Sequence, residues 1–183
     1  RRHFADPPEL DRKFTAERRL KGIGFPMISI ATAQQLRQSV GLDSANAIID
    51  QCIDEIRTDF MKPEQQVVME SVLADGGISD HFDGRLLNPG HALEAAWFIL
   101  LEAEYRGDAE LLNTGCTILD WMWARGWDNE YGGVRVFADG GQLPVPGEWH
   151  CKKVWGAPHP GKKAALLAWK PTGGSKVHAR APA

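Results

Sequence analysis

His91 and Glu94 are the residues of this sequence whose types and spacing could do acid–base chemistry. They lie three positions apart, which would place them on neighbouring parts of one helical face. Asn88 is a residue type that caps helices and Pro89 suits the first helical position, so a helix is predicted to begin here. An imidazole beside a carboxylate can take up or release a proton near neutral pH. The pattern predicts a general acid or base at a helix start.

The helix that carries this pair is predicted to be surrounded by other elements. Every residue from 92 to 101 except Glu94 is apolar, which is typical of a helix without a water-facing side. His91 and Glu94 should then be sheltered, and a buried polar group without a partner costs about 1 to 3 kcal/mol. In a functional interpretation, Glu94 or another acceptor fixes the tautomer of His91 at the mouth of a pocket. In a structural interpretation, His91 bonds a backbone carbonyl and Glu94 pairs with an arginine. If only the two residue types and their spacing are considered, this structural interpretation is preferred.

The composition indicates a globular protein with an uncharged partner. The chain has 183 residues, of which 43% are hydrophobic, and seven tryptophans, which suits one domain with a sizeable core. The net charge of -3 does not give the positive electrostatic potential that attracts nucleic acid. No apolar run is long enough to cross a membrane. Three cysteines without a CxxC pair predict a reducing, cytoplasmic compartment. Cys52 and Cys116 are expected to be small core residues.

Two helices are predicted before the one that carries His91. Apolar residues recur at helical spacing over residues 26–40, and Asp43 is expected to cap a second helix that reaches Phe60. The second helix is amphipathic. An extended segment over residues 67–73 then leads into a hairpin turn at Asp75-Gly76-Gly77.

The same order of elements then occurs again. A helix from Pro89 to Gly107, a helix capped by Asp108 and ended by Gly126, and an extended run precede a turn at Asp139. The two Ala-Asp-Gly-Gly turns are 64 residues apart. A repeated unit that cannot cover its own apolar face must stack against its neighbours. The more apolar first helices are therefore expected to form an inner layer, and the second helices an outer layer.

The predicted fold class is all-α, a partial α/α barrel with short β-hairpins at the connections between helix pairs. Residues 25–155 would hold two helix–helix–hairpin units, after an irregular lead-in over residues 1–24. Residues 156–183 form a tail of different composition: no Asp or Glu follows Glu148, whereas seven Lys and Arg residues do. Such a basic tail is predicted to be solvated or disordered.

The stretch from Gly84 to Phe98, GRLLNPGHALEAAWF, resembles the motif of the N-acylglucosamine 2-epimerase family, which includes the renin-binding proteins. The similarity covers about residues 20 to 155. Its further motifs are Leu20–Met27, Arg106-Gly107-Asp108, Gly126–Gly133, and Glu148-Trp149 followed by Lys152 and Trp155. The resemblance implies an (α/α)6 barrel about twice as long as this chain, of which these residues would be the middle section.

The resemblance also implies a sugar 2-epimerase of the N-acetylglucosamine/N-acetylmannosamine type. Family members remove a proton from the carbon next to the carbonyl of the ring-opened sugar and return one to the opposite face, with two histidines. The first corresponds to His91, and Glu94 would orient it or contact the substrate. The implied partner is a small-molecule sugar, with no metal or cofactor required. ATP is a candidate effector and a homodimer is a candidate assembly.

Five further residues are candidate sugar-binding groups: Arg85, Asn88, Trp149, Trp155 and His159. Arg85 could bond hydroxyls, although fixing a loop on a helix start is about as well expected. Trp149 and Trp155 lie in a predicted loop and could stack on a sugar, whereas most other tryptophans should be core or wall. His159 resembles a family histidine displaced by two residues, but Gly161 stands where the family has a glutamate.

This departure and the loss of acidic residues suggest that the carboxyl end is truncated or read in a shifted frame. The chain alone is therefore expected to show no turnover. Two alternatives stay open. The chain could be an inactive remnant that keeps a sugar-binding or interaction surface, or it could be another (α/α)6-barrel sugar isomerase or hydrolase. A hydrolase would need an acid and a second carboxylate that face one cleft.

Overall fold

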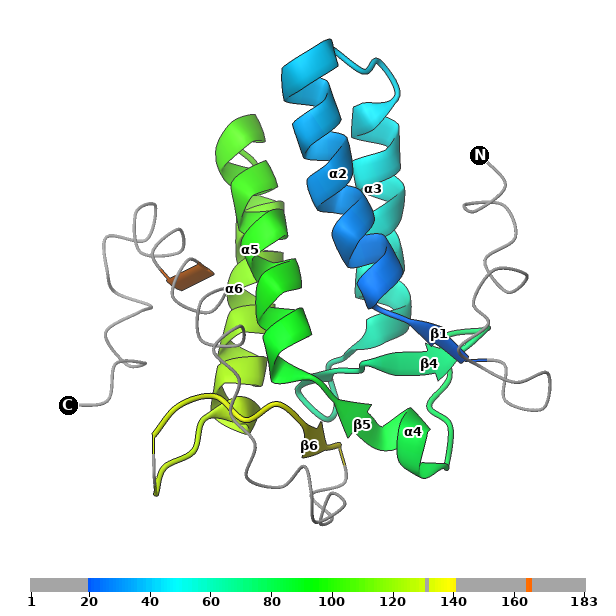
Figure 1. Cartoon of the computed structure of the whole chain (residues 1–183), viewed down its shortest axis with the longest axis vertical. Helices are drawn as coiled ribbons and strands as arrows, with labels where there is room; N and C mark the ends of the chain where they lie inside the picture. Colours follow the sequence, from blue (N-terminus) through cyan, green and yellow to red (C-terminus); the bar gives the residue numbers. More distant parts are fainter. Residues whose placement is uncertain (1–19, 131, 141–163, 166–183) are drawn as a thin grey trace.

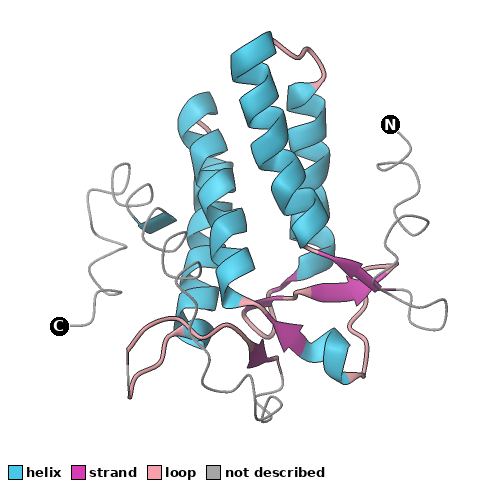
Figure 2. Ribbon diagram, viewed as in Figure 1, coloured by secondary structure: helices cyan, strands magenta, loops and turns pink. Residues whose placement is uncertain are grey.

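The computed structural model describes residues 20–130, 132–140 and 164–165. Two pairs of long helices stand on a layer of short strands, which gathers at one end of the helices (Figures 1 and 2). Its elements in chain order are β1 (Leu20–Gly22), α2 (Gly24–Val40), α3 (Ala45–Glu55), the π-helix η2 (Ile56–Phe60), β2 (Met61–Lys62), β3 (Val67–Val68), β4 (Ser71–Leu73), α4 (Phe82–Arg85), β5 (Leu86–Leu87), α5 (Pro89–Arg106), α6 (Ala109–Gly126) and β6 (Ala138–Asp139).

Local signals set the limits of three of the long helices, and these predictions are confirmed. The side chain of Asn88 accepts a hydrogen bond from the backbone of His91 at the start of α5, and Gly107 ends that helix at φ 66°. Gly41 ends α2 in the same left-handed conformation, at φ 65°, which glycine adopts without strain. The Asp108 carboxylate caps α6 by accepting from the backbone of the residues two and three positions later.

The prediction that Asp43 caps the second helix is wrong. Helix α3 begins at Ala45, so the residue in the capping position is Ser44 and not Asp43. Ser44 has helical backbone angles, and its side chain makes no capping hydrogen bond. The first N–H of the helix, that of Ala45, is instead satisfied by the backbone carbonyl of Leu42 at 3.1 Å. A backbone acceptor therefore replaces the side-chain cap, which the sequence pattern could not show.

Helix α5 lies at the centre of the helical layer. It packs against α6 and against α2, and α2 packs in turn against α3. Eleven residues of α5 are buried, in agreement with its apolar sequence. Gly115 on α6 allows the close approach to α5, because a Cβ there would lie 2.6 Å from Cγ of Leu100 and 3.3 Å from the carbonyl oxygen of Ala96.

The strands tie together the two ends of each helical pair. Strand β1 pairs antiparallel with β4, with Leu20 opposite Leu73, and β5 pairs antiparallel with β6, with Leu86 opposite Asp139. Both pairs join residues 53 positions apart in the sequence. The repeat is therefore real, with a unit that reads strand, helix, helix, strand.

The connectivity of the strands differs from the predicted hairpins. Of the strand pairs in the described residues, only β2 and β3 form a hairpin, with Met61 opposite Val68. The segment at Asp75-Gly76-Gly77 is a turn, in which the N–H of Leu73 donates to the carbonyl of Gly77, but the strand before it pairs with β1. Strand β4 lies within the predicted extended segment, but strands of two or three residues are too short to show an alternating pattern, so β1 and its pairing with β4 could not be read from the sequence.

The described residues share one hydrophobic core. Cys52 and Cys116 are buried in it as free thiols, as expected, and burial raises the pKa of the Cys52 thiol to about 12. Beyond Gly140 the structure describes only Ala164 and Ala165, and Ala164 is buried in the same core. The rest of the predicted tail lies outside the described residues. None of the described helices combines the length and the apolar character that a bilayer crossing requires.

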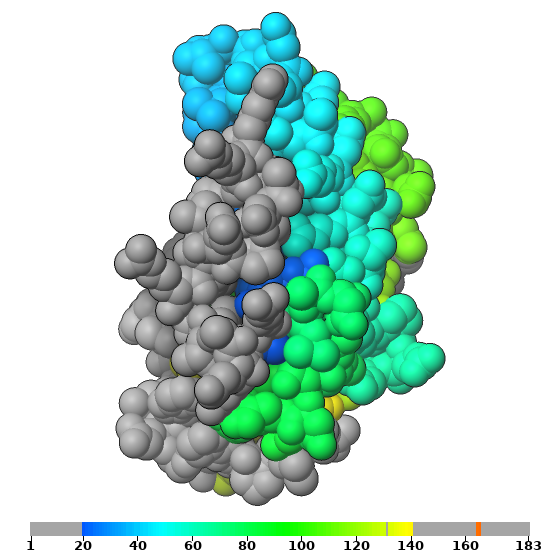
Figure 3. Space-filling model, turned by 90° about the vertical axis from the view of Figure 1, so that its right-hand side faces the viewer, coloured from blue at the N-terminus to red at the C-terminus, as the bar shows by residue number. Residues whose placement is uncertain are grey.

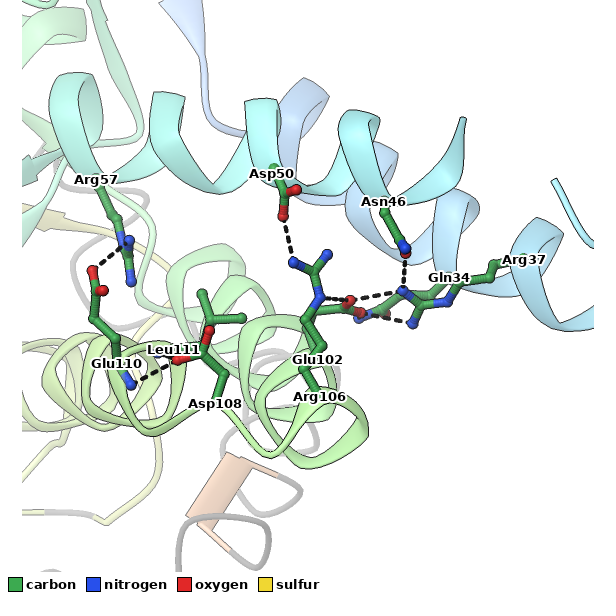
Figure 4. Close-up of polar contacts among 10 residues, drawn as sticks. All are labelled: Gln34, Arg37, Asn46, Asp50, Arg57, Glu102, Arg106, Asp108, Glu110 and Leu111. Carbon is green, nitrogen blue, oxygen red and sulfur yellow. Dashed lines mark hydrogen bonds and ion pairs between the residues drawn. The ribbon is translucent and has the colours of Figure 1, made fainter. Parts of the chain in front are cut away.

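A fully buried carboxylate, that of Glu102, joins α5 to α2 (Figure 4). It accepts hydrogen bonds from Gln34, from two nitrogens of the Arg37 guanidinium at 2.7 and 2.9 Å, and from Nε of Arg106. Arg106 extends the cluster to Asp50 on α3. Burial on its own would raise the pKa of Glu102, but the hydrogen bonds from its three partners outweigh it and hold that pKa below its ordinary value.

Candidate functional site

His91 lies in the first turn of α5, and this end of the helix adjoins the strand layer (Figure 1). Its Nδ1 atom is 3.0 Å from both carboxylate oxygens of Glu70. Its side chain is 43% exposed, so it is less sheltered than the apolar sequence of the helix predicted. Pro89, Gly90 and Ala92 in the same turn are buried, so the exposure belongs to the side of the turn that carries His91. Nδ1 of the imidazole is therefore paired with Glu70, and the side chain is partly open to solvent.

Glu70 is held in place by its main chain on both sides. Its N–H donates to the carbonyl of Leu86 at 3.2 Å, and its carbonyl accepts from the N–H of Ile23 at 3.0 Å. Its side chain is only 12% exposed. These bonds connect the residue between β3 and β4 to the start of α2 and to the strand before α5. The carboxylate thus reaches His91 from a backbone fixed by both helical units.

Glu94 does not contact His91 as a hydrogen-bond partner. It is half-buried on α5, and no hydrogen bond or ion pair joins its carboxylate to another described residue. The expected pair with an arginine is likewise not formed among the described residues. Glu94 is therefore the carboxylate of this helix face that a bound molecule could use, whereas Glu70 is the one that holds the imidazole.

Sequence reasoning missed Glu70 because it is 21 residues away from His91 and belongs to no recognised motif. A weak signal was present: Glu70 is the one charged residue in the apolar run over residues 67–73. A lone charge in a buried segment needs a partner, because leaving it unpaired is costly. That argument could have marked Glu70 as paired, but not the partner that it contacts.

Arg85 and Asn88 both contact neighbouring elements, although the buried Nε of Arg85 donates no hydrogen bond to another described residue. Nε of Arg85 lies 3.5 Å from a carboxylate oxygen of the buried Asp139, and its Nη1 lies 3.4 Å from Asp80. The carbonyl of Arg85 also accepts from the N–H of Gly140 at 2.8 Å. These contacts join α4 to β6, whereas the alternative interpretation of Arg85 expected it to fix a loop on a helix start. Asn88 caps α5 at 3.1 Å from the N–H of His91 and so places the backbone of that residue.

The remaining candidate residues, Trp149, Trp155 and His159, lie outside the described residues. Of the other tryptophans, those on the described helices and at the end of α6 are partly buried and pack against the core. Trp123 and Trp127 stack on one another with ring centroids 5.3 Å apart. These four side chains, at positions 97, 121, 123 and 127, thus belong to the wall of the helical layer, as expected.

Comparison with protein families gives one match over most of the chain. The sequence model of a family described as N-acylglucosamine 2-epimerase (GlcNAc 2-epimerase) matches residues 12–181. The N-acylglucosamine 2-epimerase of Mus musculus is 34% identical over 149 residues, which are 79% of this chain and 35% of that protein. That of Bos taurus is 42% identical over 104 residues, 56% of this chain and 24% of that protein. The chain thus spans about a third of the length of the mouse relative.

Solved structures give the same architecture. A crystal structure of D-mannose isomerase has a TM-score of 0.72 and 16% identity, and the match covers 88% of this chain and 43% of that one. Cellobiose 2-epimerase from Spirochaeta thermophila DSM 6192 has a TM-score of 0.67 and 17% identity, with 87% and 41% covered. These neighbours have an (α/α)6 barrel, so the helical layer of the present chain has the fold of part of such a barrel.

Proposed function

This chain belongs to the N-acylglucosamine 2-epimerase family, and we propose that it carries a proton-transfer site of a sugar 2-epimerase, with His91 as the residue that moves the proton. One observation carries the proposal. His91 is a partly exposed imidazole at a helix start, with one nitrogen fixed by a carboxylate at 3.0 Å. An imidazole held in this way is suited to proton transfer near neutral pH.

The reaction that fits this site acts on the open-chain aldehyde form of an amino sugar. Nε2 of His91 takes the proton from carbon 2, the C–H electron pair forms a double bond between carbons 1 and 2, and the carbonyl electrons move to oxygen. Return of a proton to carbon 2 from the opposite face inverts that centre. Because only protons move, the reaction needs no metal or redox cofactor.

Two of the other candidate residues take separate roles in this proposal. Glu94 lies one helical turn beyond His91 and has no side-chain bond to another described residue, so it would accept a hydrogen bond from a sugar hydroxyl. Asn88 would act by fixing the helix start, since its oxygen is bonded to the backbone of His91. Arg85 would hold the loop before the helix through Asp139.

The exchange of the carbon 2 proton in deuterated water tests the proposal. The full chain is incubated with N-acetylglucosamine and, separately, with N-acetylmannosamine, and the signal of that proton is followed by NMR. A single base works on one face, so we expect deuterium to enter one epimer without inversion. His91→Gln should abolish the exchange, whereas His81→Gln, a change at the exposed histidine that precedes the short helix α4, should not.

Three outcomes would contradict the proposal. Exchange that continues unchanged in His91→Gln would exclude this histidine as the base. A chain that exchanges neither sugar is the inactive remnant, and a chain that releases a new reducing end from a disaccharide is a hydrolase. The cytoplasmic compartment, the ATP effector and the homodimer stay predictions; the two buried free cysteines support the first of these.

A further inference from the structure

The carboxylate opposite His91 fixes which of its ring nitrogens carries the proton. Both oxygens of Glu70 lie 3.0 Å from Nδ1. An ionised carboxylate has only hydrogen-bond acceptors, so the Nδ1 atom must be the donor and carries the hydrogen of a neutral ring. The lone pair of the neutral ring is then on Nε2, the atom that must face the reacting carbon if His91 is a base.

The backbone around Glu70 makes this contact more than a surface ion pair. Its N–H and its carbonyl are each bonded to a different helical unit, at Leu86 and at Ile23. The Glu70 side chain is also only 12% exposed, so it has less conformational freedom to lose on pairing than a long side chain in solvent. The backbone of His91 is positioned by Asn88, whose side-chain oxygen accepts from the N–H of His91 at the helix start.

The repeat provides an independent observation. The strand pairs Leu20 with Leu73 and Leu86 with Asp139 are equivalent and lie 66 residues apart. By this offset, Glu70 corresponds to Val136 and His91 corresponds to Phe25. Neither equivalent position carries a polar group. The packing of the two described units therefore does not require a polar residue at either position, which fits a chemical role for the pair.

We infer that Glu70 is a positioning residue that holds His91 as the Nδ1–H tautomer, so that Nε2 is the atom available for proton transfer. This inference rests on the proposed function for its catalytic consequence, but the tautomer itself can be observed without any turnover. It assigns to the junction between the two units a role that neither unit can perform alone.

Long-range ¹H–¹⁵N NMR of the full chain, labelled on histidine and held above the titration of the ring, tests the tautomer. His91→Gln identifies the signal by its loss. We expect a protonated Nδ1 and an unprotonated Nε2 in the parent chain, and a shift toward the Nε2–H form in Glu70→Gln. Glu64→Gln, at an exposed glutamate in the β2–β3 hairpin, is the matched control and should leave the signal unchanged. A parent chain with Nε2–H, or a tautomer unaffected by Glu70→Gln, overturns the inference.

The exchange assay at carbon 2 gives the second measurement. Glu70→Gln should lower kcat by at least roughly tenfold, as expected when the partner that orients a catalytic imidazole is lost, with a smaller change in KM. Glu70→Asp, which keeps the carboxylate, should recover part of kcat. If the parent chain exchanges no sugar proton, the proposed function fails while the NMR result still decides the role of Glu70. If kcat is unchanged in a Glu70→Gln chain that has lost the tautomer, positioning does not contribute to catalysis.

Discussion

Arg37 on α2 and Glu102 on α5 form a doubly hydrogen-bonded ion pair, with Nη1 to Oε1 at 2.7 Å and Nη2 to Oε2 at 2.9 Å. The glutamate is fully buried and the arginine is nearly so. Arg37 also stacks its guanidinium 3.8 Å from the centre of the Tyr105 ring. This ion pair links the first helices of the two units, at the end away from the strands. Figure 3 shows these two ends, with the α2–α3 connection at the top and the green segment around α4 near the bottom.

Glu102→Gln should destabilise the chain strongly. The change leaves two guanidinium groups, those of Arg37 and Arg106, without their buried counter-charge, and removing one partner of such a cluster costs about 3 to 5 kcal/mol. Denaturant unfolding measures the loss. Glu64→Gln, at the exposed glutamate between β2 and β3, should change stability by no more than about 0.5 kcal/mol. Equal losses in the two variants would show that the cluster is not a special source of stability.

The stability of the chain should fall as the pH is lowered, because Glu102 becomes protonated. Its pKa in the folded chain lies below the ordinary value of 4.5, so on acidification the unfolded chain takes up the proton first. The contribution of this group is therefore complete above about pH 5 and is lost as the pH falls from 4.5 toward the folded pKa. Unfolding curves from pH 7 to pH 3 should show a shallower acid slope in Glu102→Gln. An identical slope in the two proteins would contradict this assignment.

Gly126→Ala should destabilise the junction of α5 and α6. A Cβ at Gly126 would lie 2.5 Å from Cβ of Pro89, the first residue of α5, and 3.2 Å from Val134. The proline ring cannot rotate away, so overpacking should cost about 1 to 3 kcal/mol and move the imidazole signal of His91. Gly24→Ala is the control, because no atom lies within 4 Å of its Cβ position, and it should be neutral or slightly stabilising. Thermal unfolding of both variants compares their stabilities. A Gly126→Ala chain as stable as the Gly24→Ala chain would contradict this prediction.

Asn88→Ala and Asn88→Ser separate capping from sugar binding. The alanine removes the acceptor for the N–H of His91 and should cost about 1 kcal/mol, whereas serine is itself a good cap and should recover most of that loss. Carbon 2 exchange is measured in parallel. Activity that follows stability in both variants fits a capping role. A serine variant that is stable but has a much higher KM would show that Asn88 contacts the sugar, in conflict with the role proposed here.

The helices could be read from the sequence because their ends are set within a turn of chain. Asn88, Gly107 and Asp108 act on residues no more than a few positions away, so residue type and spacing were sufficient. The strand partners could not be read, because β1 and β4 meet only after two helices have packed between them. Two or three residues carry too little pattern to specify such a pairing.

The residues of the candidate site also divide into those that local sequence could predict and those that it could not. His91 was found because its motif is local, and its cap was predicted with it. Glu70 was not found, because the contact depends on the approach of two backbones that are far apart in sequence and are held by Leu86 and Ile23. Spacing suggested Glu94 or another acceptor as the orienting partner, and the family resemblance gave Glu94 as an orienting or substrate-contacting residue. A separation of three residues puts two side chains on one face, but it does not make them bond.

The pairing of the first and last strands gives each unit two neighbouring ends. A chain that enters such a unit also leaves it at the same place, so an in-frame duplication of about 65 residues can insert another copy without stretching any connection. Every insertion of this kind creates a new seam between copies. Glu70 and His91 meet across one such seam. Each added copy therefore creates another junction at which two reactive side chains can meet, and the packing inside each copy does not change.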